Sequence, residues 1–244
     1  MVERVPTLVV CVVVLLTITG SPSSAQELTA AIGEGTVSDR SIQHYILLTV
    51  LSLVPALAIM FTCFPFMITV LAILRQGLGL QQSPPNMLII TLALFLTFFV
   101  MEPVFLRAWS TGVQPWSSGD MELSSAIPMV LAPFQEFMIG RVDPDTMYFL
   151  SSLRPQIEIG EISDAPLSIL VPSFLLSEIE RAFQIGFLVF LPFLIIDLVV
   201  AAILMSMGMM MVPPVIVSLP FKLAFFDVAD GWSLISGALV RRYY

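Results

Sequence analysis

The sequence predicts an all-α integral membrane protein with about four long, kinked apolar helices arranged as hairpins. The chain has 244 residues, of which 57% are hydrophobic and only 11% are charged, and its mean hydropathy is +0.97. Charged residues make up about 25% of an average soluble protein. Several apolar runs reach the length of about 20 residues that a helix needs to cross a bilayer. Prolines inside these runs predict kinks, and the net charge of −8 argues against a nucleic-acid-binding protein.

Residues 1–25 have the features of a cleavable signal peptide. Arg4 supplies positive charge before a short apolar core at residues 8–18, and small residues end the segment. We expect cleavage between Ala25 and Gln26, which leaves residues 26–44 as a polar periplasmic N-terminal segment. The alternative is an uncleaved anchor helix, which the shortness of the apolar core disfavours.

Residues 45–101 form the first predicted apolar hairpin. Its first arm is Tyr45–Leu74, interrupted by two prolines, and its second arm is Met87–Met101. The turn between them contains one arginine and no acid, so the positive-inside rule places the turn in the cytoplasm. That placement agrees with an exported N-terminus.

Residues 102–165 have a different character, with nine acidic and three basic side chains. We expect a small, acidic periplasmic region with amphipathic helices around Ser124–Ile139 and Asp143–Leu153. A soluble catalytic insert is the alternative. The region contains no histidine, no cysteine and no glycine-rich phosphate loop, which disfavours that alternative.

Residues 166–244 form the second predicted apolar hairpin. From Phe183 to Phe221 the only charged residue is Asp197, and Lys222 ends the run. The run is about twice the length of one bilayer crossing, so we expect it to be broken at Pro213-Pro214. A methionine-rich loop lies at this break, and methionine suits a surface that must repack.

The final part of the chain, residues 215–240, is a poor bilayer span. A simple count of crossings places Arg241 and Arg242 outside, against the positive-inside rule. Either this segment does not cross, or partner chains bury its charges.

Residues that carry catalytic or metal chemistry are scarce. His44 is the single histidine, and the two cysteines are Cys11, in the leader, and Cys63. A zinc site needs three or four clustered ligands, and the nucleotide-binding and hydrolase motifs are absent from the sequence. We therefore predict no catalytic, cofactor-binding or metal site, and a protein that is not an enzyme.

Several apolar motifs occur in a fixed order along the chain. They are Leu74–Gln76, Gln81–Asn86, Leu92–Phe99, Phe183–Phe187, Leu191–Val200, Leu204–Met211, Ser218–Leu223 and Asp230–Trp232. In this order the sequence resembles the FliP family, the export-gate proteins of the bacterial flagellar type III secretion system. It departs from the usual pattern at Thr62–Phe66, where the family commonly carries a basic residue in place of Phe66.

The resemblance implies a subunit of the export gate, which forms the protein-conducting pore for flagellar components. It further implies bent hairpins that assemble into a ring-like or helical oligomer of about five copies, with FliQ, FliR, FlhB and FlhA as partners. The location is the bacterial inner membrane, in the flagellar basal body.

Two other functions are compatible with parts of the sequence. The first is a virulence injectisome homologue, which the predicted leader disfavours. The second is a small-solute or ion transporter. Such transporters are built from internal repeats, which we do not find, although a single Asp197 could serve a proton relay.

The resemblance also points to Met209, Met210 and Met211 as the pore gate. One such loop from each subunit forms a deformable ring that seals the closed pore and parts around a passing chain. Methionine suits this role because its side chain is unbranched and flexible. The alternative is that the three methionines only fill an irregular turn.

Asp197 and Lys222 form a candidate inter-subunit ion pair. A carboxylate in an apolar run is costly and is usually partnered. If the chain folds back at Pro213-Pro214, the residue that faces Lys222 is near Met205, roughly 12 Å along the helix from Asp197. We therefore expect Lys222 of a neighbouring subunit to be the partner. The alternatives are an Asp197 protonated or hydrogen-bonded inside its own chain, and a proton relay.

Overall fold

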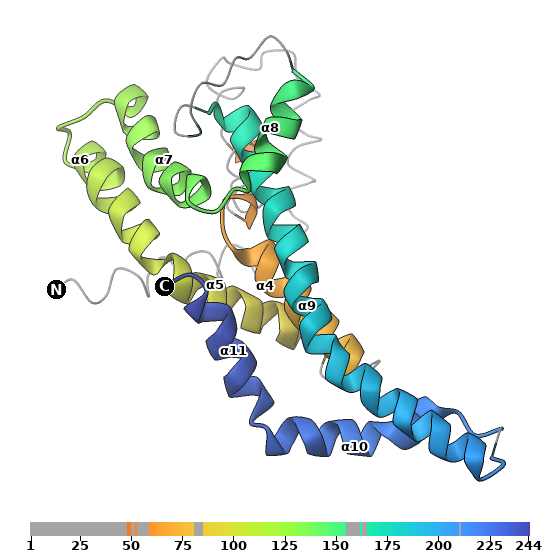
Figure 1. Cartoon of the computed structure of the whole chain (residues 1–244). Helices are drawn as coiled ribbons and strands as arrows, with labels where there is room; N and C mark the ends of the chain where they lie inside the picture. Colours follow the sequence, from red (N-terminus) through yellow and green to blue (C-terminus); the bar gives the residue numbers. More distant parts are fainter. Residues whose placement is uncertain are drawn as a thin grey trace, which may run out of the picture. The chain divides into compact units, whose positions relative to one another are not determined.

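The computed structural model of the chain describes residues 48–49, 52, 59–80, 85–154, 162, 165–209 and 211–244. The chain divides into two units, Met1–Pro55 and Ala56–Tyr244. The described part of the second unit consists of helices and the loops that connect them, and it contains no strand (Figure 1). The predicted leader and its cleavage site at Ala25 and Gln26 lie outside the described residues.

Helices α4 (Phe64–Gly77) and α5 (Asn86–Ala108) occupy the region of the first predicted hairpin. Helix α4 has Pro65 in its first turn, where proline is tolerated because that residue needs no intrahelical donor. Helix α5 does not end near Met101 as we predicted. It passes Pro103 and continues through a π-helical turn, Trp109–Val113, into α6 (Gln114–Ser117).

The π-helical turn brings Gly112 against α7 (Leu123–Ile139). A Cβ on Gly112 would lie 2.4 Å from a methyl carbon of Val130 and 2.9 Å from its backbone nitrogen. Only glycine permits this approach. The missing side chain of Gly112 lets α5 and its extension pack along α7. The Arg107–Glu136 ion pair, at 2.7 Å, joins the same two segments.

Helices α7 and α8 (Pro144–Ser152) lie where we predicted amphipathic helices. They meet at an angle of 111°. The bend falls at Asp143, whose carboxylate accepts a hydrogen bond of 2.9 Å from the Thr146 backbone and caps α8.

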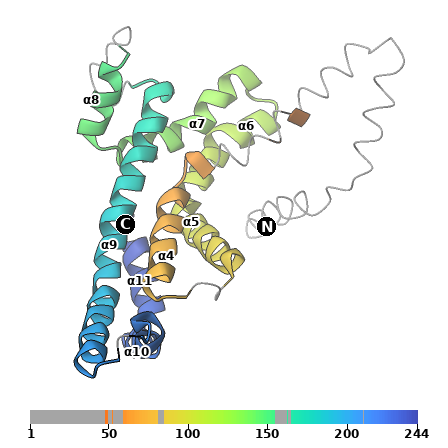
Figure 2. The same ribbon diagram turned by 90° about the vertical axis from the view of Figure 1, so that its right-hand side faces the viewer.

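Helix α9 (Leu167–Ser206) is a single helix of 40 residues, about 60 Å long. Pro172 and Pro192 lie inside it without ending it. Helix α4 runs along its side in both views (Figures 1 and 2). Gly186 makes this close contact possible, because a Cβ there would lie 2.4 Å from the side chain of Ile73.

Helices α10 (Pro214–Val228) and α11 (Gly231–Arg241) complete the chain. They are bent by 62° at Asp230, which has a left-handed backbone with φ of 49°. The corner is packed by aromatic rings: Phe226 lies 5.3 Å from Trp232 and 6.2 Å from Phe193, between centroids. A Cβ on Gly231 would lie 2.2 Å from the Phe226 ring, so the corner leaves no space there.

Two of the described helical segments, Asn86–Ser117 and Leu167–Ser206, are long and apolar enough to cross a membrane. Up to four segments qualify if the bent pairs α7–α8 and α10–α11 each count as one span. The predicted class, an all-α membrane protein with about four kinked apolar segments, is confirmed.

Candidate functional site

The first polar site lies where α4, α9 and α10 meet. The Lys222 Nζ atom lies 2.6 Å from Asp197 Oδ2 and also donates a 3.0 Å hydrogen bond to the Gly77 carbonyl at the end of α4. The Ser218 hydroxyl donates to the other carboxylate oxygen of Asp197 at 2.5 Å. The Lys222 side chain is only 3% exposed and that of Asp197 is 28% exposed. The pair therefore ties three helices together in a mostly dry environment.

This geometry corrects our prediction for Asp197 and Lys222. The two residues pair within one chain, whereas we predicted a pair between subunits. We assumed that the turn is centred on Pro213-Pro214. The midpoint of positions 197 and 222 instead falls between residues 209 and 210, so the turn is centred on the methionines.

Gly208 explains where the turn lies. Its φ of +76° is left-handed, and it follows the last residues of α9 as the glycine of a Schellman motif. The Gly208 and Met209 backbone amides donate to the carbonyls of Met205 and Leu204, both at 3.0 Å. Helix α9 thus ends several residues before the prolines, and Pro214 only begins α10. The glycine is a sequence signal that identifies this turn.

The methionine loop projects beyond the Asp197–Lys222 pair. Met211 is 98% exposed and Met209 is 43% exposed. Met210 lies outside the described residues. Among the described residues, Met209 and Met211 belong to neither buried hydrophobic cluster.

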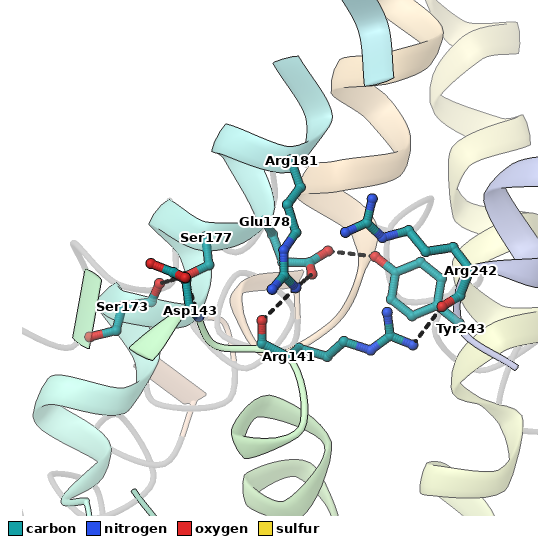
Figure 3. Close-up of polar contacts among 8 residues, drawn as sticks. All are labelled: Arg141, Asp143, Ser173, Ser177, Glu178, Arg181, Arg242 and Tyr243. Carbon is teal, nitrogen blue, oxygen red and sulfur yellow. Dashed lines mark hydrogen bonds and ion pairs between the residues drawn. The ribbon is translucent and has the colours of Figure 1, made fainter. Parts of the chain in front are cut away.

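A second polar site surrounds Glu178 on α9 (Figure 3). The Glu178 side chain is fully buried, and its Oε2 atom accepts a 2.5 Å hydrogen bond from the Tyr243 hydroxyl. Its Oε1 atom lies 4.0 Å from an Arg181 guanidinium nitrogen. The C-terminal tail is therefore fastened to the first third of α9.

Arg141, in the bend between α7 and α8, joins the same cluster from the other side. Its guanidinium stacks 4.0 Å from the centroid of the Tyr243 ring and donates to the Arg242 carbonyl at 3.0 Å. Its own carbonyl accepts a 2.6 Å hydrogen bond from Arg181. The cluster links the α7–α8 bend, α9 and the tail.

Burial shifts the pKa values of Tyr243 and Arg242 in this cluster and of Cys63. Burial, followed by the nearby charge of Glu178, raises the pKa of the Tyr243 hydroxyl, so it stays protonated and can donate. Burial and then the neighbouring Arg181 lower the pKa of Arg242. Burial raises the pKa of the fully buried Cys63 thiol to about 12, so this thiol is inert at neutral pH.

The sequence analysis missed the Glu178 cluster as a site. The charged residues of α9 and the Arg-Arg-Tyr-Tyr end were visible, but Tyr243 lies 65 positions from Glu178. Only the packing of helices brings them together. Among the described residues there is no group of three or more His, Cys, Asp or Glu side chains that could hold a metal ion.

Comparison with known proteins identifies the family of this chain. The sequence profile of the FliP family matches residues 47–239, which include every helix from α4 to α10 and most of α11. The chain belongs to the FliP family.

Three FliP relatives are similar over most of their length. Flagellar biosynthetic protein FliP of Caulobacter vibrioides is 46% identical over 90% of this chain and 82% of its own. The Rhizobium meliloti FliP is 42% identical over 98% of this chain and 99% of its own. The Aquifex aeolicus FliP is 44% identical over 87% of this chain and 89% of its own. Together with the apolar helices, membership of the FliP family identifies a membrane-embedded component of flagellar biosynthesis.

Proposed function

We propose that this chain is a subunit of the flagellar export gate and forms part of the pore through which flagellar components leave the cell. The observation that carries the proposal is the α9–α10 hairpin of a FliP-family chain, which holds an exposed methionine loop at its tip. The Asp197–Lys222 pair joins the two arms of this hairpin. A loop on a fixed base is suited to reach into a shared channel.

A channel wide enough for a polypeptide needs more than one chain. Large apolar side chains of α5 and α9 are exposed, including Phe95, Phe187, Leu188 and Leu198 at 58–69%. Such surfaces need lipid or protein neighbours. We propose that about five copies of this chain assemble, together with FliQ, FliR, FlhB and FlhA, in the bacterial inner membrane at the flagellar basal body.

The gate itself is assigned to Met209, Met210 and Met211. The full exposure of Met211 supports this role, because a methionine that only filled a turn would pack against its own chain. Flexible thioethers can close around an empty pore and adapt to any passing sequence.

The proposed topology has a leader cleaved between Ala25 and Gln26 and a periplasmic segment at 26–44. The acidic region at 102–165 is also assigned to the periplasm. Mass-spectrometric sequencing of the N-terminus of membrane-purified protein tests the cleavage. Recovery of residues 1–25 in the mature protein would refute it.

The proposed activity is passage of unfolded protein, not catalysis, and a flagellar role is preferred to an injectisome role because the relatives are flagellar proteins. An ion-transport role gains little support from Asp197, because its carboxylate already has two close partners.

Deletion of the chromosomal gene followed by complementation tests the function. Loss of the chain should abolish swimming and remove external flagellar proteins from the culture supernatant, while their intracellular synthesis continues. Plasmid-borne wild-type chain should restore both. Continued secretion of flagellar proteins by the deletion strain would refute the proposal.

A further inference from the structure

The last three residues of the chain, Arg242–Tyr244, contact helices that are far apart in the sequence. The Tyr243 ring lies 5.7 Å from the Phe66 ring of α4 and 6.1 Å from the Phe137 ring of α7, between centroids. The Tyr243 hydroxyl donates a hydrogen bond to Glu178 of α9 (Figure 3). One side chain at the end of the chain therefore contacts α4, α7 and α9 at once.

The residues on either side of Tyr243 add further contacts. The Arg242 guanidinium lies 5.1 Å from the Phe66 ring centroid. The Tyr244 hydroxyl donates to the Phe99 carbonyl of α5 at 3.3 Å, although Tyr244 is 77% exposed. We name the place where the tail meets α4, α5, α7 and α9 the tail junction. It consists of Phe66, Phe99, Phe137, Glu178 and Arg242–Tyr244.

Tyr243 is the central residue of the tail junction. Glu178 is fully buried, and its Oε1 atom has no hydrogen-bond partner within the described ranges. The nearest Arg181 nitrogen is 4.0 Å from that atom. Without the Tyr243 hydroxyl, neither carboxylate oxygen of Glu178 would have a hydrogen-bond donor in the described part of the chain. A buried carboxylate without donors is costly, so the packing of α4, α7 and α9 at this point depends on Tyr243.

We propose that Arg242–Tyr244 form a strap that closes the tail junction, and that α4, α7 and α9 stay open at this point until the strap docks. The end of a chain is synthesised last, after its N-terminal parts have begun to fold. The helices that the strap holds all precede α10 and α11. The tail junction is therefore completed only after the whole chain has been made. The strap acts within one chain, whether or not copies assemble into a gate.

The buried thiol of Cys63 reports whether the tail junction is closed. Cys63 directly precedes α4, is fully buried and interacts electrostatically with the Tyr243 hydroxyl. All test chains carry Cys11→Ala, so that iodoacetamide at pH 8 labels Cys63 alone. With Tyr243→Ala, labelling in membranes should be at least about tenfold faster than in the parent chain, because loss of the donor to a buried carboxylate favours the open form.

Tyr244→Ala is the matched control. It truncates the neighbouring tyrosine, which is mostly exposed, and leaves the hydrogen bond to Glu178 in place. The Cys63 labelling rate should then stay within about twofold of the parent rate. Tyr243→Phe keeps the ring and removes only the hydroxyl, so its rate should lie between those of the two alanine variants. Parent-like labelling with Tyr243→Ala, or equal acceleration by both alanine variants, would overturn the strap.

A second thiol tests whether the opening is confined to the tail junction. Val200 of α9 is 8% exposed and lies about 33 Å along the helix from Glu178. In chains with Cys11→Ala, Cys63→Ala and Val200→Cys, adding Tyr243→Ala should leave the labelling rate of the introduced thiol within about twofold. Equal acceleration at both reporter positions would show that the chain unfolds as a whole, and the strap would be wrong.

Stalled synthesis tests the order of events. Chains made without a stop codon in a cell-free system with membrane vesicles remain attached to the ribosome by a linker placed after Tyr244. With a linker too short for the tail to emerge, Cys63 should be labelled as fast as with Tyr243→Ala. A longer linker should give the protection of the released chain. Protection of Cys63 with the short linker would show that the junction closes without its strap and would overturn the proposal.

Discussion

Loss of one member of the Asp197–Lys222 pair should destabilise the chain strongly. Lys222 is 3% exposed, so Asp197→Leu leaves a buried ammonium whose remaining described acceptor is the Gly77 carbonyl. Breaking a buried pair costs about 3–5 kcal/mol. Since Asp197 is 28% exposed, water offsets part of this penalty, and we expect a loss of about 3 kcal/mol.

The partner substitution should cost less, and the double substitution should not add the two losses. Lys222→Met leaves a carboxylate that is 28% exposed and keeps the Ser218 hydrogen bond, so we expect a loss of about 2 kcal/mol. With both changes no charge remains buried, and Ser218 still donates to the Val215 carbonyl at 3.2 Å. We therefore expect a coupling of about 2 kcal/mol in the double-mutant cycle.

Unfolding of the purified chain by SDS in mixed micelles, followed by circular dichroism, measures these free energies. Asp227→Asn is the matched control, because Asp227 is an exposed acid on α10, the helix that carries Lys222. It should change stability by less than about 0.5 kcal/mol. An Asp197→Leu variant as stable as this control, or a double variant whose loss equals the sum of the single losses, would refute the reasoning.

Three further predictions concern other parts of the chain. Replacing Met209–Met211 by alanines should leave assembly intact but make cells that express the gate leaky to ions; leakage no greater than with wild type would contradict the gate assignment. The Cys63 thiol should resist iodoacetamide at pH 8 until the chain unfolds. Because its pKa is raised to about 12 from an ordinary value of 9.0, stability should be constant below about pH 9 and fall between pH 9 and 12, and Cys63→Ala should remove that part of the fall. Tyr243→Phe should cost about 1–3 kcal/mol in the same SDS titration, because it leaves the buried Glu178 carboxylate without its donor, whereas the exposed Tyr244→Phe should be nearly neutral; equal losses would contradict the role of the Tyr243 hydrogen bond.

The sequence predicts a membrane protein and the order of its apolar segments, because both depend on hydropathy, which is summed over neighbouring residues of the chain. Hydropathy alone places the α9–α10 run in an apolar environment, and the change to acidic composition after residue 101 correctly locates α7 and α8. The ends of the helices could not be predicted as well from the sequence. Proline disfavours the interior of a helix, yet Pro103, Pro172 and Pro192 each lie inside a continuous helix.

Pairing of charges was decided by tertiary structure. The sequence singled out Asp197 and Lys222 but assigned them to different subunits, because the register of the hairpin depends on where α9 ends. Gly208, not the proline pair, ends that helix and brings the two side chains to 2.6 Å. Moving the centre of the turn by about four residues moves the residue that faces Lys222 by about eight, or about 12 Å along a helix, which is the difference between a direct contact and none.

The Glu178–Tyr243 contact could not be predicted from sequence patterns. Local hydropathy and capping rules act over a few residues, whereas this hydrogen bond spans 65 positions and depends on the bends at Asp143 and Asp230. The sequence by itself determined that polar groups in these apolar segments need partners. Only the packing of α4, α9 and the tail decided which partners they have, because buried charges pair with whatever group the fold brings within hydrogen-bonding distance.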